Sequence, residues 1–162
     1  MQTPSPRVPE PSRVLLGCFE VGGRLLAIDV AQLREVVRFE PPTALPGAPP
    51  PIEGVIDLRG ALVPVVDLGH LLGGEKLRPG PRSRIAVAEI DGLAIGLCVD
   101  AALEILSVEA AALGAPPALA VQSGCVATRA IVRRSGEPPL ALLSLEHVLE
   151  TLHRAALAGG AP

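Results

Sequence analysis

Short runs of aliphatic residues alternate along the chain with glycine, proline and charged residues. Such runs, bounded by turn residues, are typical of strands in a β-sandwich or a small β-barrel. In three places, two runs are separated by a dipeptide with glycine, which readily adopts the positive φ angles of a two-residue hairpin turn. We therefore predict three β-hairpins. They join residues 14–20 to 24–30 across Gly22-Gly23, residues 55–58 to 61–68 across Arg59-Gly60, and residues 84–90 to 93–99 across Asp91-Gly92.

Two further segments carry apolar residues at helical spacing. Residues 30–39, VAQLREVVRF, fit a short helix with one apolar side, but they also fit a helical turn that leads into a strand, and both interpretations stay open. Near the C-terminus, Ser144 is suited to cap a helix, because its hydroxyl can accept a bond from a backbone N–H of the first turn. The apolar positions of that helix are Leu145, Val148, Leu149 and Leu152, and Gly159-Gly160 ends it.

Three segments are too rich in proline, glycine or charge to form central strands. Residues 1–13 are predicted to be a disordered tail, and residues 41–54 a loop. The polar segment 73–83, GGEKLRPGPRS, divides the chain nearly in half and is the best internal boundary. We expect a domain over residues 14–152, with two subdomains that share a core and divide near 73–83, followed by a helix end and tail over 153–162.

Composition and charge narrow the possible functions. The chain has 162 residues, of which 49% are hydrophobic, enough for one domain or two fused half-domains. A formal net charge of -3 provides no basic field, so nucleic acid and anionic lipid are not expected partners. Every apolar run ends before the roughly 18 to 20 residues that a spanning helix needs, so no membrane insertion is expected. The first residues lack the apolar stretch of a signal peptide, which predicts a cytoplasmic protein.

The sequence offers few candidates for catalysis or metal binding. Cys18, Cys98 and Cys125 stand alone in apolar surroundings without metal-ligand spacing, so we expect buried thiols in a reducing compartment. The three histidines have no partner at the spacing of a metal site. Neither a glycine-rich phosphate loop nor a nucleophile elbow occurs. We therefore predict no catalytic residue, no metal and no cofactor.

The stretch GVIDLRGALVPVVDL, residues 54–68, is aliphatic except for Asp57, Arg59 and Asp67. Two aspartates could form a paired-carboxylate active site, but such a site needs a cleft and perturbed pKa values. Ion pairing at the end of a strand is the more common role of aspartates beside an arginine. The guanidinium of Arg59 has five donors, which suits it to organise the turn or to contact a partner.

The order of motifs around this stretch resembles the CheW-like domain, the coupling protein of bacterial chemotaxis. The resemblance covers residues 14–152 and rests on Glu35-Val36-Val37, then ALPGAPPPIEGVIDLRGALVPVVDLGHLLG, then RIAVAEIDGLAIGLCVDAALEIL, and a closing LLSLEHVL. It implies a mainly β fold of two five-stranded, SH3-like barrel subdomains that share a hydrophobic core, with short helices and a C-terminal helix. This chain has Asp57 where the family usually has asparagine, and Ser144 where the family commonly has aspartate.

The resemblance also implies a function. Members of the family are non-enzymatic adaptors that connect the cytoplasmic tips of chemoreceptors to the regulatory domain of a histidine kinase, in membrane-associated arrays. The receptor groove of the family lies between the two barrels, and its positions correspond here to Leu33, Glu35, Arg59 and Ile105. Leu33 and Ile105 fit an ordinary core equally well.

Two further hypotheses concern the pathway and the charged residues. The chain can serve a non-flagellar pathway that controls motility, development or gene expression, and a small enzymatic or ligand-binding barrel that uses Asp57, Arg59 and Asp67 is the remaining possibility. Because the resemblance places Glu35 near Arg59, we expect these two side chains to form an ion pair, with Asp57 as the local competitor.

Overall fold

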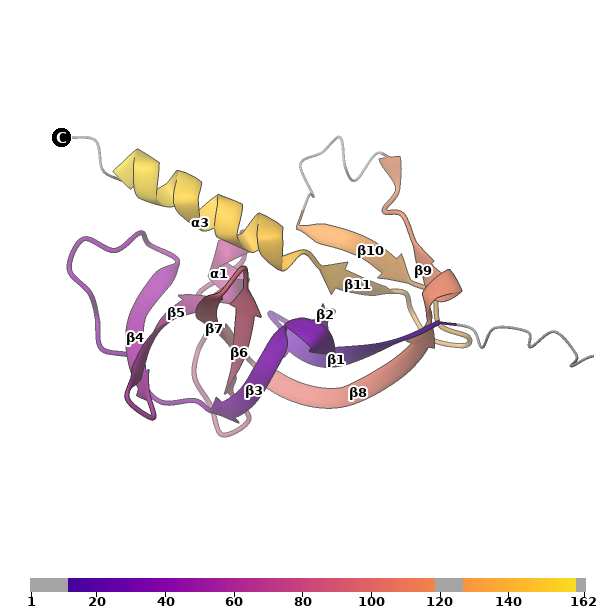
Figure 1. Cartoon of the computed structure of the whole chain (residues 1–162), viewed down its shortest axis with the longest axis horizontal. Helices are drawn as coiled ribbons and strands as arrows, with labels where there is room; N and C mark the ends of the chain where they lie inside the picture. The colour runs from indigo at the N-terminus through magenta and orange to yellow at the C-terminus, as the bar shows by residue number, and fades with distance from the viewer. Residues whose placement is uncertain (1–11, 119–126, 160–162) are drawn as a thin grey trace, which may run out of the picture.

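The computed structural model describes residues 12–118 and 127–159, which form two β-sheets and a long C-terminal helix (Figure 1). The first sheet has the strand order β8-β1-β2-β11-β10-β9 and the second has the order β3-β6-β7-β5-β4. The strands are β1 (Arg13–Val21), β2 (Arg24–Asp29), β3 (Leu33–Arg38), β4 (Ile52–Leu58), β5 (Ala61–Asp67), β6 (Arg84–Ile90), β7 (Leu93–Val99), β8 (Ala101–Glu109), β9 (Leu113–Gly114), β10 (Thr128–Val132) and β11 (Leu140–Leu143). The helices are η1 (Val30–Gln32), α1 (Leu68–Leu71), η2 (Ala110–Ala112) and α3 (Leu145–Gly159).

The three predicted hairpins are confirmed. Strands β1 and β2, β4 and β5, and β6 and β7 pair in antiparallel fashion across two-residue turns. All six turn residues have positive φ angles between 50° and 87°, as the tight turns require. Two of them, Arg59 and Asp91, are not glycine, so their left-handed conformation carries a steric cost.

The open question about residues 30–39 is also settled. Val30–Gln32 form a single 3-10 turn, and Leu33–Arg38 form strand β3, so the segment is a helical turn that leads into a strand. Asp29 begins the turn by accepting a hydrogen bond from the backbone N–H of Ala31. The tight turn carries the chain from the first sheet directly into the second.

The predicted tail boundary at residue 13 is wrong. Arg13 belongs to β1 and its side chain donates hydrogen bonds to both the hydroxyl and the carbonyl of Ser107 in β8. Residues 1–11 lie outside the described residues. At the other end, the predicted helix begins after Ser144, whose hydroxyl accepts a hydrogen bond from the N–H of His147. It continues to Gly159, so residues 153–159 are helix.

The predicted fold class is confirmed, but the division of the chain differs from the prediction. Residues 73–83 do not separate the sheets, because they connect α1 to β6, and β6 lies in the same sheet as β4 and β5. The first sheet combines β1 and β2 with β8 to β11, and the parallel pair of β2 with β11 joins the two ends of the chain. This sheet has six strands rather than five because it includes the two-residue β9. The second sheet has the expected five.

A shared core joins the two sheets and α3. It includes Phe19 and Ile28 from the first sheet, Leu97 from the second, and Leu145 and Val148 from α3. Figure 1 shows α3 running from the end of β11 over α1 and the second sheet. Two smaller clusters fill the remaining side of each sheet. Because the largest cluster draws on both sheets, each sheet depends on the other for burial of its apolar face.

The pairing pattern predicts that residues 1–78 cannot fold alone. This fragment lacks β6 and β7, the central strands of the second sheet, and it keeps only the β1–β2 hairpin of the first sheet. Isolated hairpins are marginally stable at best. We expect the fragment to show no cooperative thermal transition by circular dichroism, whereas the full chain shows one. A soluble, cooperatively folding fragment would contradict the shared core.

Candidate functional site

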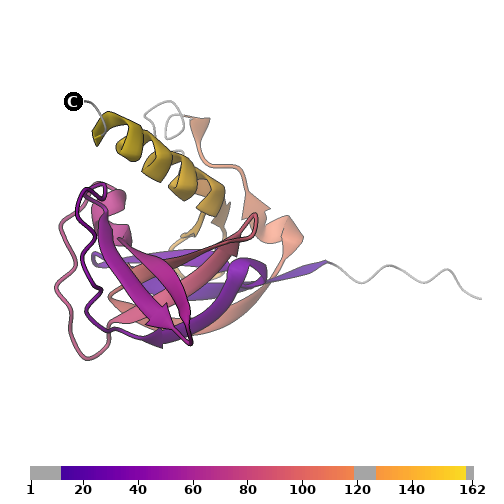
Figure 2. The same ribbon diagram turned by 60° about the vertical axis from the view of Figure 1, so that its left-hand side comes forward.

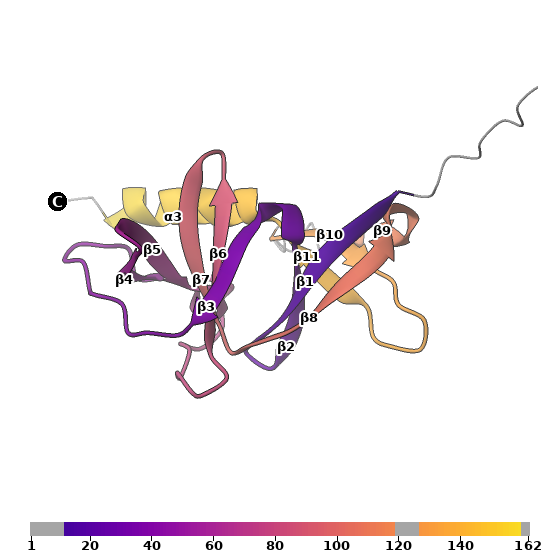
Figure 3. The ribbon, with the colours of Figure 1, turned by 60° about the horizontal axis from the view of Figure 1, so that its bottom comes forward.

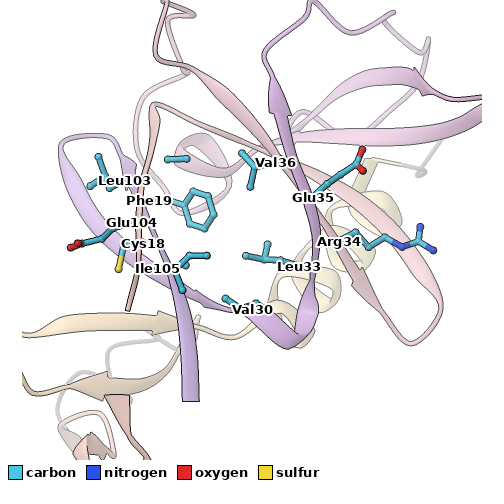
Figure 4. Close-up of a pocket in the computed structure, with 12 residues that line it drawn as sticks. Cys18, Phe19, Val30, Leu33, Arg34, Glu35, Val36, Leu103, Glu104 and Ile105 are labelled. Atoms are coloured by element: carbon cyan, nitrogen blue, oxygen red, sulfur yellow. The ribbon is translucent and has the colours of Figure 1, made fainter. Parts of the chain in front are cut away.

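An open groove lies between the two sheets. One wall is β3 of the second sheet, and the other is formed by β1 and β8 of the first sheet (Figure 3). The groove has a volume of about 320 Å³ and an apolar lining for most of its surface. Figure 4 shows Leu33 and Val36 of β3 across from Phe19, Leu103 and Ile105 of the first sheet. A concave apolar surface that links two sheets is a preferred place for a partner to bind.

Three of the four residues that the resemblance indicated line this groove. Leu33 and Glu35 come from β3, and Ile105 of β8 faces Leu33 (Figure 4). Ile105 is 67% exposed, so it is not a core residue, whereas Leu33 is half-buried and packs against the shared core. The core interpretation therefore fails for Ile105 and holds in part for Leu33.

Several residues of the groove were not predicted as site residues. Phe19 forms part of the floor, and Val36 and Leu103 add exposed apolar surface at the rim. Gly17 leaves room for Leu33, because a Cβ atom at this position would lie 3.1 Å from Leu33 Cδ1. Nothing in the sequence marks Gly17 as special, since a glycine inside an apolar run has many possible causes.

Two β-bulges shape the walls of the groove. The β1–β8 register shifts between Cys18 and Phe19, which leaves Leu103 as the extra residue on β8. The β3–β6 register shifts between Leu33 and Glu35, which makes Arg34 the extra residue on β3. A bulge bends its strand and redirects the neighbouring side chains. The bulges therefore help to aim Leu103 and Leu33 into the same space.

The fourth residue, Arg59, does not line the groove, but it reaches Glu35 from the β4–β5 turn. Its Nη2 donates a hydrogen bond to Glu35 Oε2 at 2.6 Å, which confirms the predicted ion pair. Arg59 is 74% exposed and the Glu35 side chain is 28% exposed, so the pair stands at the rim. The hydrogen bond to Glu35 raises the pKa of Arg59 above its usual value. Glu35 Oε1 is buried and accepts no hydrogen bond from the described residues.

Comparison with known proteins identifies the family of this fold. Residues 16–153 match the family model of the CheW-like domain. The chain belongs to the CheW-like family. Protein FrzA of Myxococcus xanthus is 31% identical to it over 142 residues, which cover 87% of this chain and 88% of FrzA.

Two other CheW-like relatives are informative. The chemotaxis protein CheW of Rhizobium meliloti strain 1021 is 39% identical over 90 residues, or 56% of this chain. The match spans 58% of the length of that relative. The crystal structure of the scaffolding protein TtCheW from Thermoanaerobacter tengcongensis aligns with a TM-score of 0.74 and 28% identity, covering 91% of this chain and 93% of TtCheW. The two-sheet arrangement is therefore that of a solved CheW-like structure.

The two aspartates of the opening stretch do not join Arg59 in one pocket of this CheW-like chain. Asp57 Oδ1 accepts a hydrogen bond from the N–H of Gly60 and so closes its own turn. Asp67 is 2% exposed, and its two oxygens accept hydrogen bonds from the backbone N–H groups of His70 and Leu77. Asp67 therefore caps α1 and holds the following segment against the sheet. The groove is lined by neither aspartate.

Both cysteines of the CheW-like chain that the structure describes are buried thiols, as expected. Burial raises the pKa of Cys98 to about 12, with a further contribution from the charge of Asp67. Burial also raises the pKa of Cys18, assisted by Glu104. A high pKa leaves little reactive thiolate at neutral pH. Cys125 lies outside the described residues.

Two negative findings concern the described part of the chain. Within residues 12–118 and 127–159, no three His, Cys, Asp or Glu side chains are grouped so that they could hold a metal ion. Over the same residues, no helix has the length and apolar character needed to cross a membrane.

Proposed function

We propose that this CheW-like protein is a non-enzymatic adaptor that couples chemoreceptors to a histidine kinase in a chemosensory array. The observation that carries the proposal is the apolar groove between the sheets, with the Arg59–Glu35 pair at its rim. An amphipathic helix can lay its apolar face into such a groove while polar groups at the rim set its register. The cytoplasmic tip of a chemoreceptor is the helical partner proposed for this groove.

The residues divide into two roles in this proposal. Leu33 and Ile105 bury apolar area against the receptor helix, at about 25 cal/mol per Å². Glu35 and Arg59 provide directional polar contacts, and the buried Oε1 of Glu35 is an acceptor that a donor on the receptor can reach. The regulatory domain of the kinase binds a second surface of the same domain.

The cellular context follows from the same assignment. The protein works in the cytoplasm and is recruited to membrane-associated receptor arrays through its partners, without inserting into the bilayer. A non-flagellar pathway remains the second candidate. Its support is the match to FrzA, which covers 87% of this chain and whose name, unlike that of the CheW relatives, does not include the word chemotaxis. A small enzymatic or ligand-binding barrel built on Asp57, Arg59 and Asp67 is not supported, because both aspartates are engaged by backbone N–H groups.

A pull-down from native cytosol tests the proposal. The tagged chain is expected to capture a histidine kinase and chemoreceptor fragments, identified by mass spectrometry, and the identity of that kinase decides between a flagellar and a non-flagellar pathway. Ile105→Glu is expected to reduce receptor recovery by about tenfold, because a charge in an apolar contact is left desolvated. Leu157→Glu is the matched control, since Leu157 is exposed at the end of α3 and away from the groove. A pull-down that recovers neither a histidine kinase nor a chemoreceptor fragment would refute the adaptor role.

A further inference from the structure

A second concave surface of the molecule is a cleft beside α3. Its other walls are the segment that follows α1 and the strands β2, β10 and β11 of the first sheet. Figure 2 shows α3 running above the strands. The cleft has a volume of about 1140 Å³ and shares no lining residue with the groove. Pockets for small molecules enclose about 300 to 1,000 Å³, so this cleft is large enough for several side chains of a peptide.

Two leucines expose apolar surface inside the cleft. Leu25 of β2 is 44% exposed and Leu72, at the end of α1, is 39% exposed. Half-buried Leu26 and Ile131 also line the cleft. A single exposed leucine is ordinary on a protein surface. Two exposed leucines in one concave site provide apolar surface that a partner can bury.

The lining of the cleft also includes four basic side chains. Arg24, Lys76, Arg78 and Arg154 line the cleft. Within the part of the chain that the structure describes, the first three form no ion pair, and Arg154 lies 3.6 Å from Glu150 of its own helix.

Acidic residues in the cleft offset this charge only in part. Glu75, Asp67 and Asp100 also line it, but Asp67 is buried and Asp100 accepts a hydrogen bond from the N–H of Gly22. The cleft is therefore lined by four basic and three acidic side chains, a small excess of positive charge in a chain whose net charge is -3.

Both walls of the cleft are held by contacts within the protein. Asp67 fixes the segment after α1 through its bonds to the N–H groups of His70 and Leu77. On the opposite wall, His147, Thr151 and Arg154 face the cleft from successive turns of α3. A site whose walls are ordered in advance loses less entropy when a ligand binds.

We infer that this cleft binds an acidic amphipathic helix supplied by a partner protein. The apolar side chains of that helix occupy the space between Leu25 and Leu72, and its Asp and Glu residues pair with Arg24, Lys76 and Arg78. This chemistry follows from a lining that combines two exposed leucines with basic side chains, which is complementary to a helix with one apolar and one acidic face. The inference does not depend on the proposed receptor groove, because the two sites share no residue.

Two synthetic peptides test the inference with the full-length protein. Both are about 14 residues long, or four helical turns, with leucines at i, i+3, i+4 and i+7. The remaining positions are mostly glutamate in one peptide and lysine in the other. Fluorescence anisotropy is expected to give a Kd of about 10 to 100 µM for the glutamate peptide and binding at least about tenfold weaker for the lysine peptide.

Matched variants locate the binding. Arg24→Glu with Arg78→Glu is expected to weaken the glutamate peptide by at least about tenfold, whereas Arg38→Glu with Arg133→Glu changes the net charge equally and leaves Kd within about twofold. Arg38 and Arg133 are exposed cations outside the cleft. Leu25→Gln keeps every charge and is expected to weaken binding, so it locates the site even if the double variant fails to fold. Ile105→Glu in the groove leaves peptide binding unchanged.

Three results would overturn the inference. Equal binding of the two peptides would show non-specific apolar adhesion, and equal loss in both double variants would show a general effect of net charge. Absence of glutamate-peptide binding at about 1 mM would show that the cleft has no such ligand, because even weak peptide docking is detectable at that concentration.

Discussion

Gly54→Ala is expected to lower the free energy of unfolding by about 3 to 5 kcal/mol, the largest stability change that we predict for this chain. Gly54 has a φ angle of 145°, which L-residues with a side chain rarely adopt. A Cβ atom at this position would lie 2.6 Å from the carbonyl carbon of Thr43 and closer still to its oxygen. Thr43 exchanges two backbone hydrogen bonds with Val55, at 2.8 and 2.9 Å, so relief of the clash breaks this bridge.

The expected loss combines backbone strain of about 1 to 3 kcal/mol with two hydrogen bonds of about 1 kcal/mol each. It corresponds to a decrease of roughly 6 to 20 °C in Tm, measurable by calorimetry. Gly60→Ala is the matched control: Gly60 has a φ of 87°, but a Cβ atom there would meet open space, with no contact within 4 Å. It is expected to cost about 1 kcal/mol from the backbone alone. Equal losses in the two variants would contradict the role of the Thr43 contact.

Arg59→Asn is expected to weaken capture of a receptor fragment by at least about tenfold while leaving Tm nearly unchanged. Arginine is an unusual choice for this turn position, where φ is 52° and asparagine is better tolerated. The substitution therefore suits the turn and removes the hydrogen bond to Glu35. Affinity for a purified receptor fragment, by calorimetry or surface plasmon resonance, is the direct measurement.

Two further variants separate recognition from structure at this position. Asp91→Asn makes a similar change at the equivalent position of the β6–β7 turn, where φ is 50°, and is expected to change neither Tm nor binding. The exchange of charges in Glu35→Arg with Arg59→Glu is expected to recover more binding than the sum of the single losses allows. Normal receptor binding by Arg59→Asn would show that the arginine is a bystander, and its unfolding would show that the arginine is structural.

The local part of the fold could be predicted because turn chemistry is local. Gly22-Gly23 and Asp91-Gly92 favour the positive φ angles of tight turns, and the strands on either side follow from them. The allocation of strands to sheets could not be predicted in the same way. Leu26 pairs with Ala141 in the parallel β2–β11 ladder, and no pattern within either strand specifies a partner so far along the chain. The glycine- and proline-rich composition of segment 73–83 suggested a boundary between subdomains, but composition does not specify which strands pair. The segment in fact connects α1 to β6, which lies in the same sheet as β5.

The candidate site could be predicted only in part. The ion pair of Glu35 with Arg59 followed from the resemblance, because two residues 24 positions apart show no periodic relation of their own. The bulges at Arg34 and Leu103 leave no sign in the composition of their strands. Asp67 did carry a signal, since an aspartate three residues before His70 is the position of a helix cap. Its second bond, to Leu77, depends on the tertiary fold.

The division of the first sheet between the two ends of the chain has a consequence for biosynthesis. Strands β3 to β7, which make up the second sheet, are contiguous over residues 33–99 and can pair with one another as they leave the ribosome. The β1–β2 hairpin emerges earlier but cannot gain its β11 neighbour until residue 140 has been translated. At about 5 to 20 residues per second, the hairpin waits roughly 5 to 20 s with part of its apolar surface uncovered. Until that strand emerges, the nascent chain therefore presents an open sheet edge that chaperones can bind and that other nascent chains can pair with.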